Sequence, residues 1–325
     1  MRTLWVVVNG RRLLAGLCLL FVLLFLAWLP GGIDRWRRAR FGVAPGVTLA
    51  GQPVGGWWEP EVRELVLTLA EEMRTEPADA AITSSGTIAP SRAGRRVDVD
   101  TTVQAVLNAQ AGESVEPVFV EVPPAVTEAY FTPVYRGDPS RPRISLAINV
   151  DWGADVLPEM LRTLDELHLR VTFFVTGRFA RKFPDLVRQM VRAGHELGTH
   201  GAEHVHPSLL TNSELDKLIR EGARILHDIA GVETNLFAPP YGEVNERIAR
   251  RAGQLGFRTI MWTIDTVDWT KKSADEIQQR VLSRLENGAI VLAHPMPETV
   301  KALSPLAAAV RARGFTFVPV GEILE

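Results

Sequence analysis

The chain has 325 residues, of which 46% are hydrophobic and 23% charged, enough for two modest domains or one large one. This composition excludes disordered, collagen-like and polytopic membrane proteins. The net charge of −2 combines two unlike parts, because the first 40 residues carry seven Arg and one acid, whereas the remainder carries 29 basic and 37 acidic residues. An acidic body argues against nucleic acid as a partner, since phosphate binding needs clustered Lys and Arg.

A long apolar stretch follows the first basic residues. Residues 13–29 read LLAGLCLLFVLLFLAWL, and no charge follows until Asp34. The stretch is long enough for a membrane helix of about 17–25 residues and exceeds the usual signal-peptide core of about 7–15. We therefore expect residues 1–40 to form an uncleaved signal anchor with a helix at about 13–29. A cleaved signal peptide is the alternative.

Residues 41–132 are predicted to form a small α+β module without a catalytic site. The stretch contains no His or Cys, and its acidic residues are scattered. Apolar spacing predicts its elements, which are a helix from Glu59, a strand at 81–89, a helix at 98–109 and a strand at 118–122. The segments PGVTLAGQPVGGW and GRRVDVDTTVQAVLNA resemble a peptidoglycan-binding module found beside cell-wall enzymes. A spacer that binds nothing is the alternative.

The rest of the chain alternates strands and helices. Residues 133–143 are rich in Pro, Gly and charge and are predicted to be an exposed linker. In residues 144–325, helical patterns separate the apolar runs ISLAINV, VTFFV, NLFA, FRTIMWT, AIVLA and FTFV. This alternation predicts an α/β domain with parallel strands, either a barrel or an open doubly wound sheet. In both folds, catalytic residues gather beyond the carboxyl ends of the strands.

Reactive side chains follow several of these strands. His200 and His204 are four residues apart, so one helical turn or a tight loop can aim both imidazoles at one ion. Two neutral imidazoles with a carboxylate form a standard Zn²⁺ set with an open fourth position. A polar loop is the alternative for these histidines. The full set of candidates at strand ends comprises Asp151, His195, His200, His204, His206, Asp265, Asp268 and His294.

Four segments of residues 143–325 carry motifs in a fixed order: GHELGTHGAEH (194–204), FAPPYG (237–242), DTVDW (265–269) and VLAH (291–294). They resemble, in the same order, the motifs of the polysaccharide deacetylases that share the NodB homology fold, carbohydrate esterase family four. One departure is Gly201, where many members have Ser or Thr. The resemblance implies a distorted barrel of parallel strands and helices.

The resemblance implies a metal-dependent hydrolase that removes N-acetyl groups from a cell-wall polysaccharide and releases acetate. Peptidoglycan is the expected polysaccharide. Its divalent ion, Zn²⁺ or alternatively Co²⁺ or another divalent ion, would be held by Asp151, His200 and His204. His294 would protonate the leaving amine and Asp265 would orient that histidine.

Two aromatic residues in these motifs are expected to bind substrate. Tyr241 and Trp269 would line the sugar groove, the indole offering an apolar face to a pyranose ring. Ordinary packing is the alternative for both.

The first family motif is degenerate. It should read Thr-Phe-Asp-Asp-Gly, a base followed by a metal ligand, and this chain has NVDWG at 149–153. Matching the glycines makes Asp151 the base and puts Trp152 in the ligand's place. Counting back from the following helix instead puts Asn149 at the base position and Val150 at the ligand position.

We favour Asn149 at the base position. The family's Arg that holds the base is replaced here by Ala238, and an Arg facing an Asn would be an uncompensated cation in a partly buried site. Asn149 is then expected beside the substrate. Asp151, two residues on and on the same side of an extended strand, would serve as ligand, base or both.

The pattern INVxWG with FAPP and LAHPMPETVKAL resembles a sporulation-associated subgroup whose members often lack the full catalytic set. Two hypotheses follow: an active deacetylase, or a catalytically impaired protein that binds glycan in the cell wall. Both predict an N-acetylated cell-wall glycan as partner and a single-pass membrane protein with its bulk outside the cytoplasm. The charges flanking residues 13–29 are nearly balanced, so this orientation comes from the expected substrate.

Overall fold

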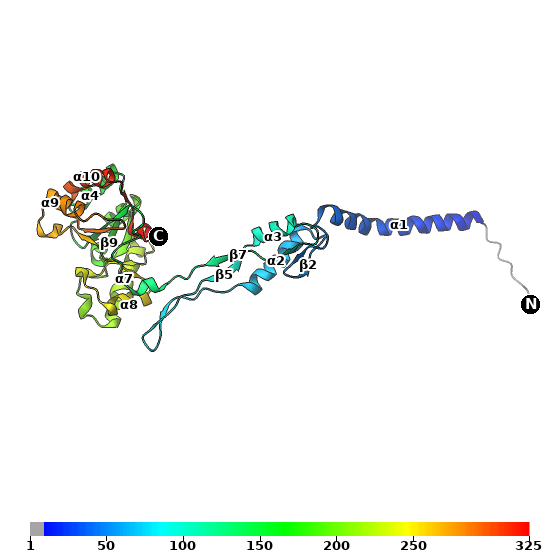
Figure 1. The fold of residues 1–325 in the computed structure, drawn as a ribbon, viewed down its shortest axis with the longest axis horizontal. Helices are drawn as coiled ribbons and strands as arrows, with labels where there is room; N and C mark the ends of the chain where they lie inside the picture. Colours follow the sequence, from blue (N-terminus) through cyan, green and yellow to red (C-terminus); the bar gives the residue numbers. More distant parts are fainter. Residues whose placement is uncertain (1–9, 325) are drawn as a thin grey trace, which may run out of the picture. The chain divides into compact units, whose positions relative to one another are not determined.

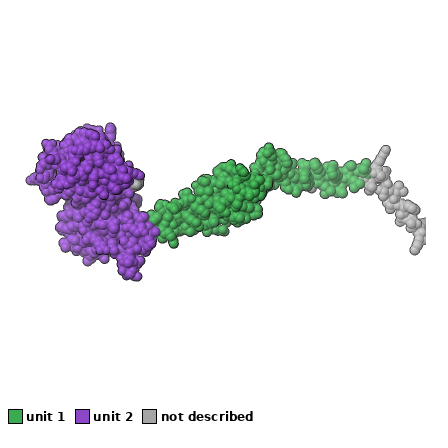
Figure 2. Space-filling model, in the orientation of Figure 1, with its two compact units in different colours: residues 1–78, 92–124 green, residues 79–91, 125–325 purple. Residues whose placement is uncertain are grey.

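The computed structural model describes residues 10–324 and divides the chain into two compact units (Figures 1 and 2). The first comprises residues 1–78 and 92–124, and the second comprises 79–91 and 125–325. The predicted linker at 133–143 is therefore wrong: Val134 pairs with Ile260 and Arg136 with Ala289 of the second unit. The local sequence of this segment is polar and rich in Pro, which is typical of a linker. Its pairing partners lie more than 120 residues away, so the local sequence gives no sign of them.

The first unit begins with helix α1 (Gly10–Phe41), which extends beyond the predicted 13–29 and passes through Gly31 and Gly32. Near its end, Arg38 donates to both carboxylate oxygens of Glu61, at 2.7 and 2.9 Å. Within residues 10–324, no helix combines the length and apolarity needed to cross a membrane.

The predicted helices of the module are confirmed. Helix α2 (Glu59–Met73) buries Val62, Val66 and Leu69, one face at helical spacing, against α3 (Val99–Asn108). The predicted strand at 81–89 is instead a hairpin, β3 (Ala81–Ile82) and β4 (Ile88–Ala89), that belongs to the second unit. The module's strands are β1 (Thr48–Leu49), β2 (Gln52–Pro53), β5 (Gly94–Val97), β6 (Ser114–Val115) and β7 (Phe119–Val122).

The second unit is built on one parallel sheet with the order β12-β11-β10-β9-β8-β14-β13, to which β15 adds by pairing with β8. The two end strands, β12 and β13, do not pair with each other, so the distorted barrel that the sequence predicts is an open, curled half-barrel. The strands are β8 (Arg143–Val150), β9 (Thr172–Val175), β10 (Glu196–Thr199), β11 (Leu236–Phe237), β12 (Arg258–Thr259), β13 (Ile264–Asp265), β14 (Ile290–Ala293) and β15 (Thr316–Phe317).

The helices of the second unit cover this sheet with apolar faces. In α4, Leu157, Met160, Leu161 and Leu164 are buried at spacings of three and four residues. Burying each such side chain stabilises the fold by about 1.5–3 kcal/mol. The helices are α4 (Leu157–Glu166), α5 (Gly177–Lys182), α6 (Pro184–Arg192), α7 (Asn212–Ala230), α8 (Glu246–Gln254), α9 (Ala274–Leu282), α10 (Pro297–Ala312) and α11 (Val320–Ile323).

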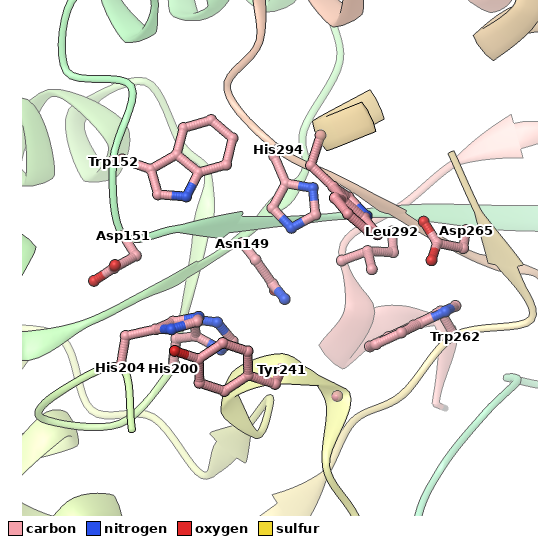
Figure 3. Close-up of a pocket in the computed structure, with 12 residues that line it drawn as sticks. Asn149, Asp151, Trp152, His200, His204, Tyr241, Trp262, Asp265, Leu292 and His294 are labelled. Carbon is pink, nitrogen blue, oxygen red and sulfur yellow. The ribbon is translucent and has the colours of Figure 1, made fainter. Parts of the chain in front are cut away.

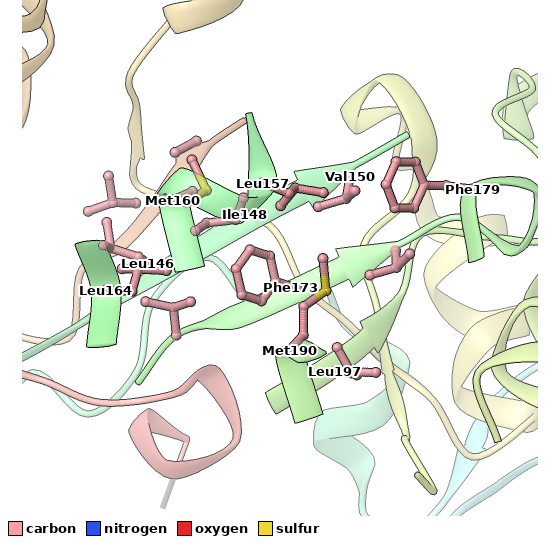
Figure 4. Packing of buried hydrophobic residues seen from close by; sticks show 14 of the residues in the cluster. Leu146, Ile148, Val150, Leu157, Met160, Leu164, Phe173, Phe179, Met190 and Leu197 are labelled. Carbon is pink, nitrogen blue, oxygen red and sulfur yellow. The ribbon is translucent and has the colours of Figure 1, made fainter. Parts of the chain in front are cut away.

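Alternation along the central strand β8 decides which side chains reach the site. Ile148 and Val150 point into the core between sheet and helices, where they lie with Leu157 and Phe173 (Figure 4). Because successive side chains point to opposite faces, Asn149 between them points to the other face of the sheet. Val150 is fully buried in this core and its side chain has no donor atom, so this position supplies no metal ligand.

Candidate active site

A pocket of about 430 Å³ opens at the carboxyl ends of the strands (Figure 3). It brings together residues from five predicted motifs, although these motifs lie up to 145 positions apart in the chain. The eight residues to which the sequence analysis gave a catalytic, metal-binding or substrate-binding role all line it. Its lining residues are Asn149, Asp151, Trp152, His200, His204, Tyr241, Gly242, Trp262, Asp265, Trp269, Leu292 and His294.

The predicted histidine pair is assembled. His200 follows β10, and its Nδ1 lies 2.7 Å from the carbonyl oxygen of Ala238. Since a carbonyl only accepts, Nδ1 carries the proton and Nε2 keeps its lone pair. The ring of His204 lies 5.1 Å away, centroid to centroid. Burial lowers the pKa of His200 to about 3 and also lowers the pKa of His204, so both are neutral at pH 7.

The conformation of the loop that carries these histidines explains why position 201, which departs from the family pattern, is a glycine. Gly201 has a φ of 86°, and a β-carbon there would lie 2.9 Å from Cδ1 of Leu218. Gly201→Ser is therefore expected to destabilise the protein by about 1–2 kcal/mol, measured by urea unfolding. Gly231→Asn is the matched control, because Gly231 also has positive φ but a β-carbon there would meet no atom within 4 Å. Equal stability of both variants would contradict this account.

Asp151 is held by an arginine that the sequence prediction did not include. Its Oδ1 accepts from Thr176 Oγ1 at 2.8 Å and from Arg178 Nε at 2.6 Å, and its Oδ2 accepts from Arg178 Nη2. Burial alone would raise the pKa of Asp151, but the hydrogen bonds from Arg178 and Thr176 hold it below its usual value.

Asn149 lies at the floor of the pocket, 6% exposed. Its Oδ1 has no hydrogen-bond partner among residues 10–324. Ala238, which replaces the family's Arg, is also buried. An amide that is buried without a partner is costly unless a bound molecule or water completes its hydrogen bonds.

The orienting partner of His294 is Asp268, and the prediction of Asp265 in that role is wrong. Asp268 Oδ1 lies 2.8 Å from His294 Nδ1, while its Oδ2 accepts from the His294 amide at 2.7 Å and from Thr299 Oγ1 at 2.6 Å. The Asp265 carboxylate instead accepts from the backbone of Val267 at 2.8 Å. Val267 has a φ of 54°, so the chain turns there and the following Asp268 points back toward β14.

Three aromatic residues of the pocket, Trp152, Tyr241 and Trp269, are exposed. Tyr241 is 55% and Trp269 57% exposed, so neither serves ordinary core packing. Trp152 was predicted only as a misfit at the ligand position, yet its ring stacks on His294 with centroids 5.6 Å apart and planes 13° from parallel. Tyr241 packs between His204 and His206, at 4.3 and 4.0 Å.

The remaining two histidines of the cluster do not line the pocket. His206 Nδ1 lies 2.6 Å from Glu243 Oε1. His195 is buried against Phe173, and its Nδ1 accepts from the Val171 amide at 3.3 Å.

His195 should make the protein sensitive to acid. Burial lowers its pKa to about 4, below the unfolded value near 6.5, so the unfolded chain binds more protons between these values. The stabilisation by neutral His195 is complete above pH 6.5 and is lost as pH falls to 4, by roughly 3 kcal/mol. Tm measured from pH 7 to 4 should fall less steeply in His195→Gln than in the parent. Parallel curves would contradict this.

The predicted three-ligand metal set fits only in part. The two neutral imidazoles fit a divalent ion, and one Nε2 is free to bind it. The carboxylate does not fit, since both of its oxygens are occupied by Arg178. In the part of the chain from residue 10 to 324, no three His, Cys, Asp or Glu side chains are grouped so as to hold an ion.

Comparison with known proteins identifies both units. Residues 137–260 match the family model "Polysaccharide deacetylase", and residues 47–116 match "Putative peptidoglycan binding domain". A peptidoglycan-N-acetylglucosamine deacetylase of Bacillus cereus is 30% identical over 188 residues, which cover 55% of this chain and 88% of that relative. The chain belongs to the polysaccharide deacetylase family. This confirms the predicted α/β fold of NodB type and the predicted resemblance of the N-terminal module.

Two relatives match this chain over most of its length. "Uncharacterized protein YlxY" of Bacillus subtilis is 29% identical over 264 residues, covering 81% of this chain and 83% of the relative. The crystal structure of BA3943, a family pseudoenzyme from Bacillus anthracis, superposes with a TM-score of 0.60 at 28% identity, covering 81% and 94% of the two chains. Family membership supports the hypothesis of an active deacetylase. The pseudoenzyme neighbour supports the alternative hypothesis of a catalytically impaired protein.

Proposed function

We propose that the second unit removes N-acetyl groups from a cell-wall glycan by hydrolysis, to give acetate and a free amino sugar. Peptidoglycan is the expected substrate. The observation that carries this proposal is the buried Asp268, which fixes His294 at the pocket by two hydrogen bonds. Nδ1 of His294 faces the carboxylate, which leaves Nε2 for the substrate. The relatives named as peptidoglycan-N-acetylglucosamine deacetylases support the choice of substrate.

The protein's own residues supply a proton to the leaving group. In its protonated form, His294 donates from Nε2 to the departing nitrogen, and Asp268 stabilises the imidazolium. The face of Trp152 limits how the ring can rotate. Exposed Tyr241 and Trp269 offer flat surfaces to sugar rings. The family resemblance implies a divalent ion, for which we expect Zn²⁺ because the free donors are imidazoles.

Glycan binding without hydrolysis is the second candidate function. It is favoured by Asn149, whose amide cannot accept a proton from water, and by Asp151, whose carboxylate is paired with Arg178. Under this hypothesis the same pocket holds an N-acetylated glycan and the unpartnered oxygen of Asn149 accepts a hydrogen bond from it.

The two functions are separated by measuring acetate released from N-acetylglucosamine oligomers and from isolated peptidoglycan, with glycan binding measured in parallel. We expect release by the full-length protein, loss of release in His294→Ala, and no effect of His227→Ala. His227 is a half-exposed histidine of α7 outside the pocket, which makes it the matched control. Binding without acetate release by the parent would establish the second function instead.

We propose further that the chain is held at the cell membrane with its bulk facing the wall. The apolar sequence of residues 13–29 and the match of the first unit to a peptidoglycan-binding family support this placement. Membrane fractionation and protease protection of whole cells test it. Recovery of the full-length protein in the cytosolic fraction, protected from external protease, would contradict it.

A further inference from the structure

We infer that Arg178 is a built-in counter-ion that withholds Asp151 from the histidine pair, so that this chain offers a divalent ion two imidazoles rather than three ligands. The inference deepens the proposed function, because it names the residue that controls metal binding at the same site. It concerns the affinity for the ion and not the rate of hydrolysis.

The first step is the geometry of the ion pair. Arg178 engages both carboxylate oxygens through Nε and Nη2, the fork arrangement in which a guanidinium binds a carboxylate most strongly. Thr176 adds a third donor at 2.8 Å. The Asp151 side chain is 6% exposed, so water does not compete freely for these oxygens. A carboxylate that accepts three hydrogen bonds in a buried place has little tendency to leave its partners.

The second step is the position of Arg178, which is fixed by the same loop that carries the histidines. The amide of Gly177 donates to the carbonyl of Gly201 and the amide of Arg178 to that of Ala202, both at 2.8 Å. Thr176 caps α5 by accepting from the amide of Phe179. The backbone of Arg178 is therefore held against the loop that carries the histidine pair, and from there its side chain reaches Asp151.

The third step is electrostatic. A divalent ion at the histidines would add two positive charges near a guanidinium, and one carboxylate cannot neutralise both cations. Asp151 must leave Arg178 before it can bind the ion. The side chain of Arg178 is half-exposed and borders an open hollow of about 470 Å³, also lined by Lys182 and Phe183, so it has room to swing away.

Arg178→Gln in the full-length protein tests this inference. Removing the guanidinium frees Asp151 and removes a cation that repels the ion, so the affinity for Zn²⁺ measured by calorimetry should rise by about 10-fold or more. With Co²⁺ as a spectroscopic probe, the variant should show a stronger visible absorption than the parent at equal Co²⁺. Tm without metal should fall, because a buried carboxylate has lost its partner, and should recover when Zn²⁺ is added.

Matched variants show whether the gain in Zn²⁺ affinity depends on Asp151. Adding Asp151→Asn to Arg178→Gln should return the affinity to the parent value. Arg181→Gln, on the same helix but paired with Glu221, should leave it unchanged. If Arg178→Gln does not fold, Arg178→Lys serves instead, since Lys keeps the charge but loses the fork, and a smaller gain in Zn²⁺ affinity is expected.

Two results would overturn the inference: a Zn²⁺ affinity unaffected by the loss of Arg178, or the same gain in the variant that also lacks Asp151. Both readouts are independent of acetate. A gain in metal affinity without acetate release would refute the proposed function and leave this inference standing. Acetate release with unchanged metal affinity would refute this inference and leave the proposed function standing.

Discussion

Asp268→Asn is expected to lower the rate of acetate release by about 10²- to 10⁴-fold. The Asp268 carboxylate accepts from His294 Nδ1 and fixes the tautomer that aims Nε2 at the substrate. An Asn amide carries no negative charge, so it does not stabilise the imidazolium, the doubly protonated ring that gives its Nε2 proton to the leaving nitrogen. Initial rates on N-acetylglucosamine oligomers measure the effect, with glycan binding expected to stay within about twofold.

Asp265→Asn is the matched control for this prediction. Asp265 lies three residues away in the same motif and lines the pocket, but its carboxylate bonds to the backbone of Val267 and not to His294. We expect a much smaller loss of rate in this variant. A larger loss in Asp265→Asn than in Asp268→Asn would contradict the assignment of Asp268 as the orienting residue.

Asn149→Asp, combined with Ala238→Arg, is expected to raise the rate of acetate release by about 10²-fold. Asn149 is buried at the pocket floor on the strand face that points into the site, where a carboxylate could accept a proton from water. Asn149→Asp alone should give a smaller gain that grows with pH, because a buried carboxyl without a cation has a raised pKa. The pH profile of the rate measures this.

The control for this gain in rate is a triple variant that combines Asn149→Asp and Ala238→Arg with His294→Ala. The leaving amine then has no acid, so the gain should disappear. A gain that persists without His294, or a double variant no faster than the parent, would show that position 149 is not the place of the base.

The site's histidines and its general location could be predicted from sequence because the motifs follow strands whose carboxyl ends meet at one edge of a parallel sheet. Asn149 and Asp151 both line the pocket, as the twofold repeat of a strand predicts, although β8 ends at Val150 and Asp151 is the first residue beyond it. The pocket lining confirms that part of the prediction.

What could not be predicted depends on pairing across the fold. Asp265 and Asp268 have the same local sequence signal, and the turn at Val267 decides which of them meets His294. Arg178 gave no signal at all, because its partner lies 27 residues away and only the pairing of β8 with β9 brings them together. The segment at 133–143 was mistaken for a linker for the same reason.

The most direct test of the account is the stoichiometry of products from an N-acetylated glycan treated with the full-length protein. Acetate and free amino groups are counted together, for the parent and for Asp268→Asn. We predict that the parent forms both in equal amounts and that Asp268→Asn forms neither at a comparable rate. A parent protein that binds the glycan and releases no acetate would contradict the account.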